Sequence, residues 1–146
     1  MRDILFIGFH PCEDGKETIW INGKEIKGFW AFGNFVKAEK LDYSEYEYFI
    51  IQFGADGYTY EVIPETVGQY IGQTDMHEKS IFEDDVLGIP NSNRKGLPAM
   101  VRYNSRTASF EIQRIGYNPI LLNEVEYWGE IVGNKWSNPE LLEVSK

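Results

Sequence analysis

Short apolar runs separated by turn-forming residues dominate the chain. Valine, isoleucine, tyrosine, phenylalanine and tryptophan recur in these runs, and glycine, asparagine, aspartate and proline separate them. This pattern is typical of strands joined by turns, whereas helical periodicity is scarce. The first run, Ile4 to Phe9, is short and apolar almost throughout, so we interpret it as a strand buried on both faces. The pattern predicts a mainly β protein.

The best local turn signal is the pair Asn22 and Gly23, which lies between two apolar segments. Asparagine followed by glycine accepts the positive φ angles of a two-residue type I′ hairpin. The next strand is predicted over Phe29 to Val36. Gly28 and Gly33 are expected to be bulges or places where another backbone approaches closely.

Two more hairpins are predicted further along the chain. Tyr48 to Phe53 and Tyr58 to Ile63 flank a four-residue connection that contains two glycines. Val101 to Tyr103 and Phe110 to Ile112 alternate apolar and polar residues, which predicts a half-exposed hairpin. Glu124 to Val132 is predicted to be a further strand.

The tail is predicted to form a short C-terminal helix. Asn138 is suited to the N-cap position, Pro139 to the first helical position and Glu140 to the first turn. Leu141 and Leu142 continue the helix.

Three ordered segments resemble the phage and prophage YopX family. Members of that family carry ETVGQYTGLKD, then a turn, then K-E-I-Y/F-E-G-D-I-V, and Glu61 to Leu87 reads EVIPETVGQYIGQTDMHEKSIFEDDVL. The tail IVGNKWSNPELLE resembles the family's closing VIGN…NPELLE, and the opening MRDILFIGF resembles its M-R-E-I-K-F-R-A-W.

The resemblance implies small antiparallel barrels, with an SH3-type barrel in the C-terminal half. We expect a single YopX-like domain over residues 1–146, with a β-hairpin part over about 1–63 and an SH3-like barrel part over about 64–146. The chain departs from the family at two places: His77 and Glu78 replace its Asn-Gly turn, and Asp84 replaces the glycine before aspartate. Positive φ is costly for such residues, so the first turn is expected to be longer or of another type.

Leu5 and Ile7 replace polar residues of the family's first strand. An apolar residue on the second face of a strand indicates that another element or another subunit covers that face. A homo-oligomer is therefore one expected assembly.

Charge is distributed unevenly. The net charge is −9, yet residues 91–119 carry five basic residues and one acidic residue, a net +4, so the remainder carries −13. The overall field repels polyanions. The candidate binding residues are Arg94, Lys95, Arg102, Arg106 and Arg114, interleaved with Tyr103, Phe110 and Tyr117. They could hold phosphates and stack bases, or form a solvated face paired with the chain's own carboxylates. We favour the second interpretation.

No catalytic or metal-binding motif stands out. Glu83 to Asp85 is acidic, but consecutive strand residues point to opposite faces, and Asp85 is expected to accept a hydrogen bond in a turn. His10, Cys12 and His77 lack the further ligands of a zinc site, and no nucleophile elbow or phosphate-binding loop occurs. We expect a protein that is not an enzyme and uses no cofactor or metal. The tryptophans are expected in the core or in oligomer contacts.

The chain is expected to stay in the cytoplasm of a bacterial host cell and not to enter a membrane. It has no apolar run long enough to cross a bilayer, and Asp3 stands where a secretory signal carries positive charge. Its single cysteine, Cys12, agrees with a reducing compartment.

The leading hypothesis is a phage- or prophage-encoded accessory protein of unknown molecular function that is a non-catalytic binding or assembly module for an unidentified protein partner. Two alternatives remain. One is nucleic-acid binding through the basic hairpin. The other is an acidic mimic of DNA that binds a basic host protein.

Overall fold

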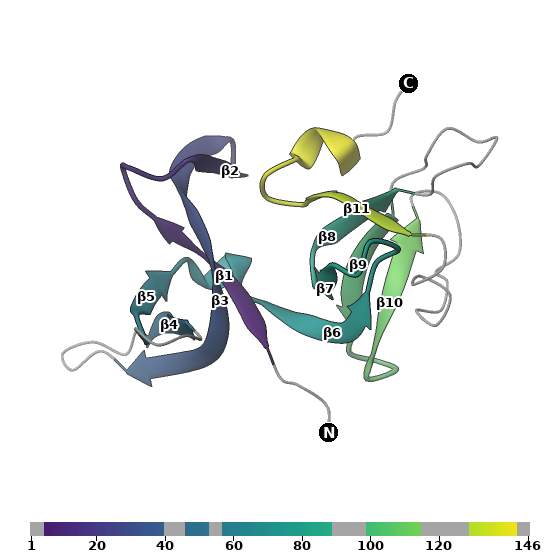
Figure 1. The fold of residues 1–146 in the computed structure, drawn as a ribbon, viewed down its shortest axis with the longest axis horizontal. Coiled ribbons are helices and arrows are strands. Elements are labelled where there is room, and N and C mark those ends of the chain that lie inside the picture. Colours follow the sequence, from purple (N-terminus) through teal and green to yellow (C-terminus); the bar gives the residue numbers. More distant parts are fainter. Residues whose placement is uncertain (1–4, 40–45, 53–56, 89–98, 115–128, 143–146) are drawn as a thin grey trace. The chain divides into compact units, whose positions relative to one another are not determined.

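The structure is a computed structural model that describes residues 5–39, 46–52, 57–88, 99–114 and 129–142. Antiparallel strands make up most of it (Figure 1), which confirms the prediction of a mainly β protein. The chain forms two compact units, unit 1 over Met1–Tyr70 and unit 2 over Ile71–Lys146. In the described part of the chain, no helix has the length and apolar character that a membrane crossing requires.

Unit 1 is built around one long strand. It contains β1 (Phe6–Pro11), β2 (Glu17–Ile21), β3 (Lys24–Glu39), β4 (Tyr46–Gln52), β5 (Thr59–Val62), the 3₁₀ helix η1 (Pro64–Thr66) and the beginning of β6 (Gly68–Thr74). The sheet order is β5-β4-β3-β1-β6, and β2 pairs separately with β3 (Figure 1). The 16 residues of β3 thus pair with β2, β1 and β4 in turn.

The predicted turn and close approaches are confirmed. Asn22 and Gly23 have φ angles of 51° and 79° and join β2 to β3. A Cβ atom on Gly28 would lie 2.0 Å from the carbonyl oxygen of His10, and one on Gly33 would lie 1.9 Å from that of Ile51. Both glycines are therefore needed because neighbouring strands pass too close for a side chain.

The core of unit 1 lies on one face of this sheet. Phe35 of β3 stacks on Tyr48 of β4 with ring centroids 5.5 Å apart, and the predicted hairpin of β4 and β5 extends the same face. The core consists of Ala31, Ile50 and Val62, with Phe6, Phe29, Phe35, Tyr48, Tyr60 and Val67 packed against them. Odd-numbered positions of β3 therefore face the core.

Unit 2 contains shorter strands. They are the rest of β6, β7 (Ser80–Phe82), β8 (Asp85–Gly88), β9 (Ala99–Asn104), β10 (Ser109–Arg114) and β11 (Glu130–Asn134), followed by the 3₁₀ helix η3 (Pro139–Leu142). β7 pairs with β6, and the other four have the order β10-β9-β8-β11. The core gathers Ile71, Ile81, Leu87, Ala99, Val101 and Ile112. The predicted hairpin is confirmed as β9 and β10, with Val101 buried and Tyr103 45% exposed.

Two details of unit 2 differ from expectation. The described strands form open sheets, and no pairing among them closes a barrel. The SH3-type barrel therefore stays a prediction. The tail forms one 3₁₀ turn rather than the expected capped helix. The Asn138 side chain accepts a hydrogen bond from the Asn134 N–H, 3.2 Å away, and is thereby used to hold the turn after β11.

Positive φ occurs where the family has glycine. Glu78 has a φ of 64° and Asp84 a φ of 70°. The connection from Asp75 to Lys79 between β6 and β7 is longer than a two-residue turn, and the Asp75 N–H donates to the Lys79 carbonyl at 2.8 Å. The expectation of a longer turn is confirmed.

We predict that Glu78→Gly raises the free energy of unfolding by about 0.5–1 kcal/mol. The left-handed conformation costs an L-residue about 1–2 kcal/mol, and the greater freedom of glycine in the unfolded chain offsets about 0.4–1 kcal/mol of the gain. Urea denaturation measures the change. The control Met76→Gly lies in the same turn without positive φ and should lower stability. If Glu78→Gly lowered the free energy of unfolding, the inference that Glu78 is strained in this turn would be contradicted.

Candidate functional site

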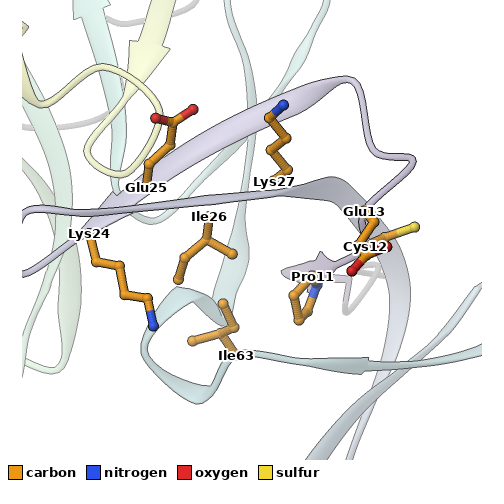
Figure 2. Close-up of a pocket in the computed structure, with 8 residues that line it drawn as sticks. All are labelled: Pro11, Cys12, Glu13, Lys24, Glu25, Ile26, Lys27 and Ile63. Carbon is orange, nitrogen blue, oxygen red and sulfur yellow. The ribbon is translucent and has the colours of Figure 1, made fainter.

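Unit 1 has a groove with a volume of about 710 Å³. Figure 2 shows the side chains around it, and Lys24 and Ile26 of β3 point toward Ile63. The lining residues are Pro11, Cys12, Glu13, Lys24, Glu25, Ile26, Lys27 and Ile63. The groove combines apolar walls with ammonium and carboxylate groups, which suits binding of a polypeptide better than binding of a small apolar ligand.

The connection from β1 to β2 borders this groove. The Gly15 N–H donates to the Cys12 carbonyl at 3.0 Å, which turns the chain sharply after Pro11. A Cβ atom on Gly15 would lie 2.3 Å from the Cα of Gly28, so the connection crosses directly over β3 at that glycine. No sequence motif announced the groove, because it arises from this crossing.

The candidate basic residues are only partly brought together. Arg102 and Arg106 are exposed on the hairpin of β9 and β10, and Arg114 ends β10, although its side chain is not described. Arg94 and Lys95 lie outside the described residues. Arg102 donates a hydrogen bond to the Gln113 side chain and stands opposite Glu111 in the register.

This arrangement resembles a solvated strand face. Glu111 also accepts a hydrogen bond from the Asn104 side chain at 3.2 Å, so a carboxylate sits among the basic side chains. The aromatic pair Tyr103 and Phe110, with centroids 5.3 Å apart, belongs to the opposite face of the hairpin because it alternates with Arg102.

The acidic segment forms a tight turn between β7 and β8. The Asp85 carboxylate accepts a hydrogen bond from the Phe82 N–H at 2.9 Å, as predicted. The pKa of Asp85 is raised to about 7, mainly by burial; the Phe82 N–H acts against the shift, and the charges of Asp84 and Asp75 add to it. Burial also raises the pKa of Asp84, against the effect of the Lys135 ammonium.

Asp75 is a buried acidic residue that the sequence reasoning missed. Only 1% of the surface of this residue is exposed. One oxygen accepts from the N–H groups of His77 at 2.8 Å and Lys79 at 3.0 Å, and the other accepts from the Ile131 N–H at 3.0 Å. The available signal was its position at the end of ETVGQYIGQTD, the segment that resembles the family signature.

These hydrogen bonds determine the protonation of Asp75. Burial by itself raises the pKa of the carboxyl, but the three backbone N–H groups and the charge of His77 outweigh it, so the pKa lies below its ordinary value. Asp75 is thus an ionised group that ties the β6–β7 connection to β11.

The histidines and the cysteine serve local contacts. The His10 Nδ1 atom lies 2.6 Å from the Glu61 carbonyl oxygen, and His77 Nε2 lies 3.3 Å from Glu130 Oε1. Cys12 is a half-buried free thiol. Among the residues that the structure describes, no three histidine, cysteine or acidic side chains gather as a metal site would require.

The tryptophans occupy varied surroundings. Trp30 packs edge-on against the buried Phe9, with ring centroids 5.1 Å apart, whereas Trp20 is 39% exposed. The Lys135 ammonium lies 4.7 Å from the ring centre of Trp136. Trp128 lies outside the described residues.

Comparison with known proteins identifies a family and similar solved structures. A model of the YopX protein family matches residues 15–143. The fold is similar to the crystal structure of protein EF1440 from Enterococcus faecalis, with a TM-score of 0.54 and 18% sequence identity. That match covers 98% of this chain and 100% of the other. No curated protein matches the chain.

Proposed function

The chain belongs to the YopX protein family, and from that premise we propose that it is a non-catalytic assembly module, an accessory protein encoded by a phage or prophage. Its partner is a second copy of the same chain, and it acts in the cytoplasm of the bacterial host cell. The C-terminal half is proposed to have an SH3-type arrangement of strands. The observation that carries the proposal is the second face of the unit 1 sheet.

That second face, which we name the outer face, is apolar. It consists of Ile7, Trp30, Phe32, Asn34, Val36, Phe49 and Ile51, which the strand register places side by side on β1, β3 and β4. Phe9 lies on the same side but is fully buried within the chain. Phe32 is 44% exposed and Val36 is 37% exposed. Since the opposite face already forms the core, the sheet is apolar on both faces, as in sheets that are covered on both sides. An exposed apolar area of this kind favours protein association.

The outer face can accept a second copy despite the charge of the whole chain. The whole chain has a net charge of −9, so two copies repel each other at long range. None of the residues named above is charged, but two carboxylates lie at the margin of the outer face: Glu61 of β5, which pairs with Phe49, and Glu47 of β4, which pairs with Ala38. Two outer faces can therefore meet about a two-fold axis in a register that keeps these carboxylates apart. The expectation drawn from Leu5 and Ile7, that another element or another subunit covers this strand, has the same basis.

We predict that Val36→Glu disrupts this assembly. It places a carboxylate within the outer face, and burying an unpaired charge costs several kcal/mol, on the order of a thousandfold in affinity. Size-exclusion chromatography of wild type and variant measures the effect. The matched control is Val132→Glu, because Val132 is 46% exposed in unit 2, and it should elute with the wild type. Co-elution of Val36→Glu with the wild-type protein would contradict the proposal.

A further inference from the structure

Near the beginning of β3, the strand β2 lies along one of its edges and β1 lies along the other. In a hairpin with a two-residue turn, the residues that flank the turn form a hydrogen-bonded pair, and such pairs alternate along the ladder. Ile21 and Lys24 flank the turn here. The backbone N–H and C=O of Glu25, one residue further, therefore point away from β2.

The other edge belongs to β1, but only in part. The Cys12 N–H donates to the Lys27 carbonyl at 2.9 Å, which is the last bond of β1 to β3 in this direction. The chain then turns and crosses over Gly28 to reach β2. Among the described residues, no strand pairs with this edge between Lys24 and Ile26.

The groove lies along that open edge. Four consecutive residues of β3 line it, and in Figure 2 Lys24 and Ile26 point toward Ile63 while Glu25 and Lys27 point the other way. Because side chains from both faces of one strand line the same groove, the groove follows the edge of that strand rather than one face. Its position continues the line of β1 beyond Pro11.

We propose that this groove binds an extended segment of a partner protein, which adds a strand to the edge of β3 and continues the direction of β1. Main-chain hydrogen bonds to Glu25 supply part of the affinity, as in other cases of strand addition to a sheet edge. This binding site goes beyond the proposed self-association and uses residues outside the outer face.

The side chains of the groove specify the segment. Lys24 and Ile26 lie on the same face, two positions apart, so the bound residues opposite them are also two apart. An apolar residue fits against Ile26, Pro11 and Ile63. A carboxylate fits opposite Lys24, which makes no ion pair among the described residues. Glu25 between them favours a basic residue. The antiparallel segment therefore reads apolar, basic, acidic from its N-terminus.

The test uses a fluorescent peptide with the core Thr-Ile-Lys-Glu-Thr, and fluorescence anisotropy measures its affinity for the full chain. We expect saturable binding that is about tenfold tighter than that of a peptide in which lysine replaces the glutamate. Lys24→Glu should reverse this preference, whereas the exposed Lys79→Glu in unit 2 should leave it unchanged. Absence of saturable binding, or an unchanged preference in Lys24→Glu, overturns the proposal.

Two proline variants test the edge itself. Glu25→Pro removes an N–H that faces the groove, so we expect loss of peptide binding with a melting temperature within about 3 °C of the wild type. Ile26→Pro removes an N–H that bonds to β2 and should lower the melting temperature much further. If Glu25→Pro still binds the peptide, or if both variants melt alike, the open edge is refuted. Size-exclusion chromatography of the same variants measures self-association separately, so a loss of peptide binding can be distinguished from a loss of self-association.

Discussion

Asp85→Asn is expected to raise the free energy of unfolding by about 2–4 kcal/mol at pH 8 and to leave it nearly unchanged at pH 4. The asparagine keeps an oxygen that can accept the bond from the Phe82 N–H, so the local turn is preserved. What changes is the charge, since the Asp85 carboxylate is buried beside the charges of Asp84 and Asp75.

The direction of the effect follows from the pKa of Asp85, which is about 7 in the folded protein and about 3.9 in an unfolded chain. Between these values the unfolded state holds fewer protons, so wild-type stability falls as pH rises. Each unit of difference corresponds to about 1.4 kcal/mol. Asparagine does not titrate, and the variant therefore lacks this loss.

Urea denaturation at pH 4, 6 and 8 measures the predicted divergence. The exposed Asp14 of unit 1 supplies the control Asp14→Asn, whose stability should follow the wild type at each pH. If the free energies of unfolding of Asp85→Asn and wild type changed in parallel with pH, the Asp85 carboxyl would not be in a buried environment that favours its protonated form.

Asp75→Ala is expected to lower the free energy of unfolding by about 3–5 kcal/mol, because bonds to a charged acceptor are worth about 1.5–3 kcal/mol each and do not add fully. It leaves the N–H groups of His77, Lys79 and Ile131 without their acceptor. The loss should appear in unit 2, because all these groups belong to it.

Denaturation of Asp75→Ala and Asp75→Asn together tests this account. Asparagine retains one acceptor oxygen, so its cost should lie between that of alanine and zero. Because the folded pKa of Asp75 is lowered, its contribution is present above about pH 4 and is lost as pH falls further. A cost below about 1 kcal/mol for alanine would contradict the role of Asp75 as a tie between the β6–β7 connection and β11.

Local rules were sufficient wherever a feature depends on a few adjacent residues. The Asn22–Gly23 hairpin was predicted correctly because positive φ is a property of those two residues. The family resemblance likewise located Glu78 and Asp84 as strained positions. The tail forms a short 3₁₀ helix over Pro139–Leu142, but the predicted cap is not made, because the Asn138 side chain bonds backward to Asn134. Capping preferences do not include this competition.

Features that depend on distant partners could not be predicted. Asp75 is buried because it receives a bond from Ile131, which lies 56 positions later in the chain. The basic hairpin looked like a patch in sequence, but the strand register sets Arg102 opposite Glu111 and beside Gln113. The groove required knowledge that the chain crosses over Gly28 between β1 and β2.

Sedimentation equilibrium of the unmodified protein over a wide range of concentrations tests the central claim most directly. If the outer face is covered by a second copy, the measured mass rises with concentration to twice the 16.9 kDa of a single chain. A mass that stays at the single-chain value throughout would contradict the proposal that this family member assembles through the outer face of its first sheet.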